Sequence, residues 1–481
     1  MILKGYAFGI GYALVCLLLS FVLYKLGVPK KYTRKAVHIL VGFEWVILYH
    51  FMGAGIHFLA VCILFLVLLF IAYKGRLMPM ISSDSDNAPG TVYYALAMAG
   101  VSLVGCFIPE VMLPFGIGVM CTSIGDGFAG VIGQLIGKGN PKIYFEKTLL
   151  GSVSNLVLSS LSAFVISLAF GMELNVAECL LIGLLSAELE LITPFGLDNI
   201  SITWGTTALA FAFMYFVGIG NYLLPIILSP IIIIFATKKK ALTTGGVVMA
   251  IILDIAVSVA FGNSGFVILV IYFASAIIVD KIKKRYKNSS RNESDEATDC
   301  RNYMQVIANG LVAFVASVAY FFSGKTLFVV PFVASLAESF SDTAASGIGI
   351  FSKTTYDPFR RRFCENGLSG GMSALGTSAS LISAFLLSFF AFVIGIPGFG
   401  VAELFIVAFS AFLGAVFDSL LGSLLQVKHK CTVCNSLTER EVHCFEPTVK
   451  HSGFELIDND VVNMLSCAFA GVLATVLAIL V

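Results

Sequence analysis

Acidic, basic and amide residues of this chain gather at the ends of apolar segments, and one of them lies inside such a segment. Asp126 stands within the apolar run 122–133, and Lys138, Lys142 and Lys147 follow it. A carboxylate inside a membrane-spanning helix is energetically expensive and is usually functional. Carboxylate oxygens suit Mg²⁺, and lysines bind phosphate groups. We therefore expect Asp126 to hold Mg²⁺ and the three lysines to bind nucleotide phosphates.

The same stretch has a second interpretation, which is close packing of helices. Gly125, Ala129, Gly133 and Gly137 recur every four residues and form a stripe of small side chains. Such a stripe lets neighbouring helices approach closely. Packing explains most of these glycines, but it leaves Asp126 unexplained.

A basic group opens an earlier apolar segment. Arg34 and Lys35 have a simple explanation as cations that reach the membrane surface, but His38 lies one helical turn further in. His38 is either an interior histidine with satisfied hydrogen bonds or a group that joins Arg34 and Lys35 in binding phosphate.

An acidic and amide group follows a later apolar segment. Asp198 and Asn199 have the type of a helix N-cap, which is the commoner use of such a pair. Capping does not explain Glu190, which lies inside the apolar run. We expect Glu190 or Asp198 to hold the metal or accept a proton, and Asn199 to contact the nucleotide.

The second half of the chain repeats this crowding of polar residues at segment ends. Packing and capping explain each residue singly, but four carboxylates at membrane level are too many for those roles alone. The candidate metal ligands are Asp342, Asp418, Asp458 and Asp460, of which Asp342 and Asp418 are also the candidate catalytic residues. The expected polar support comes from Gln305, Asn309 and Asn463.

Two stretches beside these carboxylates are candidates for phosphate binding. Lys353 and the arginines 360–362 either anchor the chain at the membrane surface or bind phosphate, and the sequence favours neither. The glycine-rich run 367–376, which includes Gly370 and Gly371, can present backbone N–H groups to phosphates at a helix start.

The chain has 11 cysteines, and most lie in apolar segments where they behave as small hydrophobic side chains. Cys431 and Cys434 have the spacing of zinc ligands, with His443 and Cys444 following. Because two adjacent residues can hardly both ligate one ion without strain, we slightly favour reduced cysteines without zinc. The sequence contains no Walker A motif, so a nucleotide site here is of another type.

The elements that must position these residues are membrane helices. Hydrophobic residues make up 58% of 481 positions, charged residues 12%, and the mean hydropathy is +0.94. A spanning helix needs ~20 apolar residues, so we expect an all-α polytopic membrane protein with roughly sixteen spans in two bundles. The expected spans are 3–24, 36–51, 54–72, 91–107, 111–136, 148–170, 176–194, 200–218, 222–237, 243–261, 264–279, 303–322, 326–346, 368–392, 399–425 and 461–480.

Charge placement predicts the orientation. With those spans, every cluster of Lys and Arg falls on one side, which the positive-inside rule makes the cytoplasm. We expect both termini outside, active sites facing the cytoplasm, and a bacterial or archaeal plasma membrane. The net charge of +1 gives no reason to expect a nucleic-acid partner.

The chain divides at a cluster of lysines into two expected domains, 1–237 and 238–481, with a flexible cytoplasmic loop at 281–302. The first span lacks a cleavage site and is expected to be retained. The halves show no repeat, which counts against an inverted-repeat transporter.

The first half resembles the polytopic phytol and dolichol kinases, a group related to the CDP-diacylglycerol synthases. The likeness covers about residues 20–220. It is carried by Arg34-Lys35-x-Val-His38, Gly90-Thr91-x-Tyr93-Tyr94, Gly125-Asp126-Gly127, Lys147-Thr148-x-x-Gly151-Ser152 and Gly196-x-Asp198-Asn199. The resemblance implies phosphorylation of a long isoprenoid alcohol with CTP or a related nucleotide. Thr148 stands where Ser is usual and keeps the hydroxyl group.

The second half resembles a membrane family that includes plant phytyl-phosphate kinase. The likeness covers about residues 240–481, from Ala241-Leu242-Thr243 to Asp458-Asn459-Asp460. Gly347 stands where that family usually has Glu, which removes one candidate metal ligand.

Together the two resemblances imply consecutive steps in one chain: a prenol (phytol, farnesol, geranylgeraniol or a polyprenol) to its monophosphate, and the monophosphate to the diphosphate. Mg²⁺ and a nucleoside triphosphate, CTP by resemblance, are the implied cofactors. The alternatives are a cytidylyltransferase that acts on phosphatidate and a membrane transporter.

Overall fold

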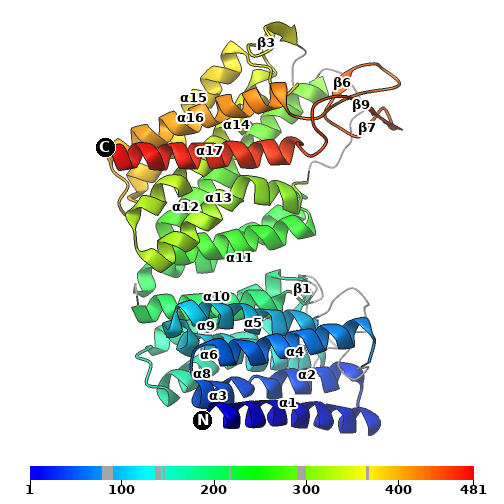
Figure 1. Ribbon diagram of the computed structural model, residues 1–481, viewed down its shortest axis with the longest axis vertical. Helices are drawn as coiled ribbons and strands as arrows, with labels where there is room; N and C mark the ends of the chain where they lie inside the picture. The colour runs from blue at the N-terminus through cyan, green and yellow to red at the C-terminus, as the bar shows by residue number, and fades with distance from the viewer. Residues whose placement is uncertain are drawn as a thin grey trace. The chain divides into compact units, whose positions relative to one another are not determined.

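The computed structural model describes residues 1–77, 90–135, 142–144, 147–194, 196–215, 218–289, 300–364 and 368–481. The chain forms two compact units, Met1–Ile234 and Phe235–Val481. Both units are predominantly helical (Figure 1). Each unit is described by itself below.

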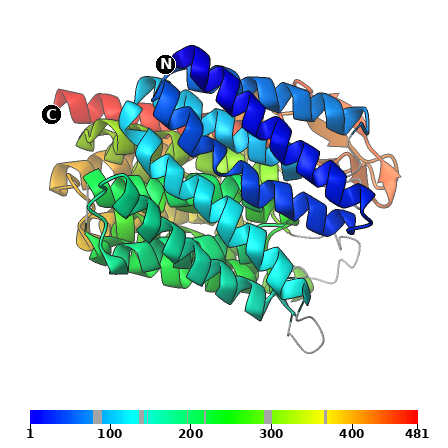
Figure 2. The same cartoon turned by 90° about the horizontal axis from the view of Figure 1, so that it is seen from below.

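The first unit is a bundle of helices whose axes run roughly alongside one another (Figure 2). Its helices are α1 (Ile2–Lys25), α2 (Lys30–Val41), α3 (Glu44–Met52), α4 (Ile56–Lys74), α5 (Gly90–Phe107), α6 (Met112–Met120), α7 (Gly127–Leu135), α8 (Leu149–Ala169), α9 (Val176–Ile192) and α10 (Asp198–Tyr215). Helix α11 (Leu223–Lys238) ends just past the boundary between the units. Shorter elements are η1 (Pro109–Val111), η2 (Cys121–Asp126), η3 (Ile219–Tyr222), β1 (Lys142–Tyr144) and β2 (Lys147–Thr148).

The most enclosed segment of this unit is the run of α6, η2 and α7. Every residue from Pro114 to Ser123 is buried, and α8, α9 and α10 pack against this run. Gly116 allows the ring of Trp45 to lie against the backbone of α6. This packing holds the carboxyl end of η2, where Asp126 lies, in a fixed position among the other helices.

The second unit is built around α14, which packs against five other helices. Its helices are α12 (Thr244–Ser289), α13 (Tyr303–Ser323), α14 (Val329–Gly349), α15 (Ala374–Ile394), α16 (Val401–Leu424) and α17 (Asn459–Leu480), with a short turn η4 (Thr326–Phe328). The side chains of Phe332, Val333 and Leu336 on α14 are fully buried at the centre of this core.

Short strands occupy the connections at one end of this bundle (Figure 1). β3 (Thr355–Asp357) pairs with β4 (Arg362–Cys364), and β7 (Val442–His443) pairs with β8 (Glu446–Pro447). β5 (Lys428–Lys430) lies between β6 (Leu437–Thr438) and β9 (Val449–Ser452). All pairs are antiparallel. The all-α expectation therefore holds for the apolar segments, while the connections add small β-structures.

The chain reverses direction within α12. Gly262 has φ 59° and ψ −142°, which is not helical, and a Cβ on Gly265 would lie 3.1 Å from Val257 Cγ1. Residues eight apart in a continuous helix are ~12 Å apart along its axis, so the helix must fold back here. A positive φ of this kind suits glycine, which has no Cβ.

Among the described residues, thirteen helical segments are long and apolar enough to span a membrane, against the roughly sixteen expected. The hairpin in α12 counts once, although the sequence predicts two spans there. Helix α9 has only 17 residues and carries several glutamates, and α10 is rich in threonine and other polar residues. These three differences account for the gap between the two counts.

The prediction of a flexible loop at 281–302 is wrong for the first part of that range. Helix α12 continues to Ser289, while residues 290–299 lie outside the described part of the chain. Helix α15 begins at Ala374, six residues later than the expected span, because Met372 pairs with Tyr356 of β3 instead.

Candidate functional site

Lys35 and Asp126 form the centre of a charged cluster in the first unit. Lys35 Nζ lies 2.8 Å from Asp126 Oδ2 and donates a second hydrogen bond to the Asp126 carbonyl oxygen at 3.1 Å. The Asp126 side chain is 6% exposed. A buried carboxylate needs such a partner, because transferring an unpaired charge out of water is energetically costly.

Local backbone structure prepares this contact. Residues Cys121–Asp126 form a π-helical turn, a feature that is frequent at functional sites. Gly130 lies under the aliphatic part of Lys35, since a Cβ there would stand 2.6 Å from Lys35 Cε. The lysine can therefore cross α7 closely enough to reach the carboxylate.

The glycine stripe serves helix packing, as its spacing predicts. Gly125 faces Ser159 and Asn155 of α8, and a Cβ on Gly133 would stand 2.6 Å from the hydroxyl group of Thr148. Both interpretations of this stretch are therefore compatible: the stripe packs on α8 while Asp126 meets Lys35.

His38 belongs to the same cluster. Its Nε2 donates to the carbonyl oxygen of Thr122 at 3.0 Å and lies 3.6 Å from Asp126 Oδ2. The imidazole ring also contacts the edge of Tyr94 with ring centroids 5.1 Å apart. His38 thus has satisfied hydrogen bonds and stands beside the carboxylate, so both interpretations of this residue survive.

A second set of charges surrounds Lys147. Its ammonium nitrogen lies 2.8 Å from Glu190 Oε1 and 2.8 Å from Asp198 Oδ2. Burial lowers the pKa of Lys147, but the Asp198, Glu190 and Asp126 carboxylates raise it by more, so the net shift is upward. The Asp126 carboxylate also interacts electrostatically with Lys147. The two sets therefore form one site with three carboxylates and two lysines.

The loop before α10 brings Asn199 to this site. Asn199 Nδ2 donates to the carbonyl oxygen of Gly196, while its Oδ1 is buried without a partner. Gly196 has φ 80°, and a Cβ there would lie 3.1 Å from the Cα of Gly90. The unpartnered oxygen of Asn199 is therefore available to a ligand.

An apolar cavity that is open on one side adjoins the charged cluster. It is lined by α1, α2, α3, α4 and α5, mostly with aliphatic and aromatic side chains. Arg34, His38, Thr91 and Tyr94 are the polar residues at the ends of α2 and α5 that border it. His38 is thus shared between the cavity and the carboxylate of Asp126.

Glu44 also lines this cavity, and the sequence analysis missed it. Its side chain is buried, and Oε1 has no hydrogen-bond partner. A glutamate inside an apolar run was the available signal.

Three carboxylates of the second unit interact electrostatically with one another. Glu338 and Asp342 lie four residues apart on α14, and both interact electrostatically with Asp418 of α16. Cys467 Sγ donates to Glu338 Oε2 at 2.9 Å, and Ser466 Oγ donates to Asp418 Oδ2 at 3.3 Å. Glu338 Oε1 is buried without a partner.

The remaining predicted ligands lie at the start of α17. Asp458 accepts a hydrogen bond from the backbone N–H of Val461, so it caps this helix. Asp460 follows in the first turn. Asn463, with its amide oriented to satisfy its neighbours, donates to Asp418 Oδ2 at 3.3 Å. Asn463 thus supports the carboxylate group, while Asp458 has a structural role as a cap.

Asn309 takes part in a separate polar network. Its Nδ2 donates to the carbonyl oxygen of Gln305, and its Oδ1 accepts from Ser339. Ser339 in turn contacts the hydroxyl group of Tyr272 at 2.8 Å. Gln305 forms a capping box with Asn302 at the start of α13.

Close packing explains the glycines of the predicted phosphate loop. Gly370 has φ 90°, and a Cβ there would lie 2.5 Å from the Cα of Ser423. The N–H of Gly371 donates to the carbonyl oxygen of Leu368, so it is not available to a phosphate in this conformation. Lys353 is exposed.

A buried polar group beside this loop escaped the sequence analysis. Asp357 accepts hydrogen bonds from Ser423 and from the backbone of Arg360. Burial raises the pKa of Asp357, but these hydrogen bonds outweigh it and the net shift is downward. Lys428 is 2% exposed and donates to the carbonyl oxygen of Ser369 at 2.7 Å.

Gly347 has a clear packing reason. A side chain there would collide with Val279 of α12. A glutamate, which the resemblance leads us to expect at this position, would have no space here.

Two predicted phosphate ligands have side chains outside the described part of the protein. Lys138 lies outside the described residues, and so does the side chain of Lys142, of which only the backbone in β1 is described.

The sequence of this chain matches a known family of membrane proteins. A family model described as integral membrane protein DUF92 matches residues 227–471, just over half of the chain. The chain belongs to this DUF92 family of integral membrane proteins. No solved structure matches it.

Individual relatives of this DUF92 chain include one protein that is named as a kinase. Phytol kinase of Synechocystis is 27% identical over 198 residues, which cover 39% of this chain and 81% of that protein. Protein VTE6, chloroplastic, of Arabidopsis thaliana is 24% identical over 253 residues, which cover 50% of this chain and 68% of that protein. An uncharacterized membrane protein of Methanocaldococcus jannaschii is 25% identical over 210 residues, which cover 42% and 82%.

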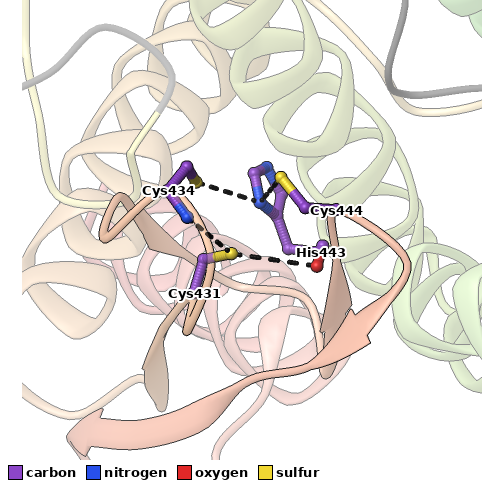
Figure 3. Close-up of side chains that lie close together, drawn as sticks. All are labelled: Cys431, Cys434, His443 and Cys444. Atoms are coloured by element: carbon purple, nitrogen blue, oxygen red, sulfur yellow. Dashed lines mark hydrogen bonds between the residues drawn. The ribbon is translucent and has the colours of Figure 1, made fainter.

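The connection between α16 and α17 in this DUF92 chain brings together three cysteines and one histidine (Figure 3). One possible ligand atom from each of Cys431, Cys434, His443 and Cys444 lies within 4.8 Å of the others. Hydrogen bonding from the Cys434 N–H is the main cause that lowers the pKa of Cys431 to about 6. The structure therefore brings together residues that the sequence analysis placed near one another but did not favour as ligands.

Proposed function

We propose that this chain is a bifunctional isoprenoid-alcohol kinase. The first unit phosphorylates a prenol, and the second converts the monophosphate to the diphosphate. The observation that carries the proposal is the position of His38, which lines the apolar cavity and also lies 3.6 Å from the Asp126 carboxylate. A long apolar alcohol in that cavity would hold its hydroxyl group beside the charged cluster.

The cavity suits an isoprenoid chain by its lining. Val61, Phe65 and Leu69 recur every four residues on α4 and face it, and Ala95 and Met98 of α5 lie opposite. Apolar burial of this kind contributes about 25 cal/mol per Å² of surface removed from water. Such a lining does not select strongly for chain length, so we expect several prenols to bind.

The donor set of the charged cluster fits Mg²⁺ and nucleotide phosphates. Asp126, Glu190 and Asp198 offer the hard oxygen ligands that Mg²⁺ prefers, and they outnumber the nearby lysines Lys35 and Lys147. When bound, Mg²⁺ would neutralise charge on the nucleotide phosphates. Asp126 and one of Glu190 and Asp198 would hold it.

The lysines and His38 perform the rest of the first step. Lys35 and Lys147 pair with the phosphates, and His38 and Arg34 orient the hydroxyl group at the cavity mouth. The hydroxyl oxygen bonds to the γ-phosphorus, the bond to the bridging oxygen breaks, and the nucleoside diphosphate leaves. Glu190 or Asp198 accepts the hydroxyl proton. Positioning and charge neutralisation supply most of the catalysis in such reactions.

The second unit has the parts for a related step. Glu338, Asp342 and Asp418, which interact electrostatically, are our proposed ligands of a divalent cation, with Asn463 as polar support. Similarity to a protein named phytol kinase supports kinase chemistry in the chain. CTP is our proposed donor, and both sites face the cytoplasm, where nucleotides are available.

The experiment is a phosphate-transfer assay with the full chain in liposomes. CTP labelled in the γ-phosphate, Mg²⁺ and farnesol, geranylgeraniol or phytol are supplied, and the lipid products are separated. We expect labelled prenyl phosphates together with CDP. Release of pyrophosphate with phosphatidate as acceptor would instead identify a cytidylyltransferase, and absence of labelled lipid with both CTP and ATP would overturn the kinase proposal.

A further inference from the structure

We propose that Cys431, Cys434, His443 and Cys444 bind one structural zinc ion in the connection between α16 and α17. This site lies apart from the carboxylate groups and does not rest on the proposed kinase activity. The ligand set of three cysteines and one histidine is typical of structural zinc sites.

The distances match the edges of a tetrahedron around zinc. Zn–S bonds of ~2.3 Å and Zn–N bonds of ~2.0 Å place a sulfur and a nitrogen ligand ~3.5 Å apart. His443 Nδ1 lies 3.4 Å from Cys434 Sγ and 3.3 Å from Cys444 Sγ. All four ligand atoms lie within 4.8 Å of one another, pointing to a common centre (Figure 3).

The first pair of ligands sits on a turn that is built to present thiolates. The sulfur of Cys431 accepts hydrogen bonds from the N–H groups of Val433 and Cys434 at 3.4 and 3.5 Å. Asn435 follows with φ 60°, which closes the turn between β5 and β6. N–H donors aimed at a sulfur favour its negative form, which is the form that binds metal.

The second pair resolves the objection that adjacent residues can hardly both ligate. Cys444 and Phe445 are the two central residues of the β7–β8 hairpin, and their φ values are 53° and 62°. Two-residue hairpins with this geometry usually carry asparagine and glycine, because other side chains are strained there. The turn brings Cys444 Sγ back to the ring of His443, and a metal bond to both residues would stabilise this strained geometry.

The connection has almost no apolar core to hold it. Between residues 429 and 458, Cys431 is the only buried side chain. Val442, Phe445 and Leu456 are 58%, 91% and 88% exposed. Small folded segments that cannot bury enough apolar surface usually depend on a metal or on disulfides, and all three cysteines here are free.

The zinc ion would fix a contact with the glycine-rich loop. Glu439 lies between the two ligand pairs in sequence and accepts a hydrogen bond from the backbone N–H of Ser369 at 2.8 Å. Lys428, just before the first ligand pair, donates to the carbonyl oxygen of the same residue. Metal binding would therefore fix Glu439 and Lys428, which bind the backbone N–H and the carbonyl oxygen of Ser369. The zinc ligands would thus act as positioning residues for that loop.

Zinc content of the full chain, purified in detergent under reducing conditions, is the first test. We expect about one zinc per chain, and cobalt in its place should give the absorption bands of a tetrahedral thiolate site. Cys431→Ser and Cys434→Ser should each reduce the zinc content to about none. Cys300→Ser is the matched control, because Cys300 lies in another connection of the same unit, and it should retain the metal.

A rescue variant keeps the test decisive if a serine variant fails to fold. His443→Cys keeps four zinc ligands, now four cysteines, and should retain about one zinc per chain. His443→Ala removes one ligand and should lose most of the zinc. A chelator should also speed proteolysis within residues 432–456 of the wild-type chain. Purified wild-type protein that neither contains zinc nor binds added zinc or cobalt would overturn the proposal, as would Cys431→Ser with full zinc content.

Discussion

Lys35 of α2 and Asp126 at the end of the π-helical turn form a 2.8 Å ion pair, although 91 positions separate them in the chain. The pair connects the helix that lines the apolar cavity with the helix that carries the buried carboxylate. Lys147 makes the equivalent connection to Glu190 and Asp198. The lysines thus hold the carboxylates ready in one place, and a nucleotide with Mg²⁺ would compete for both kinds of charge.

Lys35→Met should weaken nucleotide binding by removing a phosphate partner. We expect the KM for CTP to rise about tenfold or more, because a charge-assisted hydrogen bond contributes about 1.5–3 kcal/mol. Lys35→Arg keeps the charge and should retain much of the affinity. Kinetics across CTP concentrations measure this, and an unchanged KM in Lys35→Met would contradict the assignment.

Lys147→Met should destabilise the first unit by about 2–3 kcal/mol, because two partly buried carboxylates lose their cation. The readout is the midpoint of thermal unfolding in detergent, with Lys147→Arg as the control. The pKa of Lys147 is raised, so its stabilisation is fully present below the usual lysine value of ~10.4 and is lost only as the pH rises through the higher folded value. Between pH 6 and about 9 the difference between Lys147→Met and wild type should therefore not diminish through titration of this lysine; a fall in that range would count against a charged Lys147.

Ala95→Leu should reduce the space for the isoprenoid chain. Ala95 lines the cavity and is 4% exposed, so the added carbons have to enter the cavity or displace its walls. We expect a roughly tenfold or greater loss of kcat/KM with geranylgeraniol and a smaller loss with a short prenol. Ala60→Leu, on an exposed position of α4, is the matched control. Equal losses with both alcohols would show that the cavity does not hold the chain.

Asp418→Asn tests whether the carboxylates of the second unit bind a divalent cation or have only a structural role. The Asp418 carboxylate and the carboxylates of Glu338 and Asp342 repel one another. Removing the charge of Asp418 should therefore raise the midpoint of thermal unfolding when no divalent cation is present. The same variant should lose the stabilisation that added Mg²⁺ gives the wild type. Glu446→Gln, on the exposed strand β8, controls for the loss of a charge. Mg²⁺ stabilisation that persists in Asp418→Asn would argue against this ligand.

The sequence identified polar residues that lie buried in the first unit, but it did not identify their partners. Apolar periodicity and the expense of a buried charge single out Asp126, His38 and Glu190, because these signals are local. The pairing of Lys35 with Asp126 depends on how α2 packs against α7, which no local pattern encodes. Glu338 was missed although it stands four residues before Asp342 on α14, a spacing that places both on one helix face.

Glycines show the same limit in the second unit. A glycine-rich run near a helix start has the pattern of a phosphate loop, yet Gly370 is required because the backbone of Ser423 approaches it. Steric needs of this kind arise from tertiary contacts. The reversal at Gly262 was predicted correctly as a boundary between two spans, because a break in hydropathy is visible in the sequence.

The most direct measurement supplies prenol and γ-labelled CTP to the wild type, Asp126→Asn and Asp418→Asn, and separates the lipid products. The account predicts mono- and diphosphate from the wild type and monophosphate alone from Asp418→Asn. Asp126→Asn should make neither product from the alcohol but should convert supplied monophosphate to diphosphate. If Asp126→Asn phosphorylates the alcohol at the wild-type rate, or if the wild type makes no labelled lipid, two sequential kinase sites in this chain are contradicted.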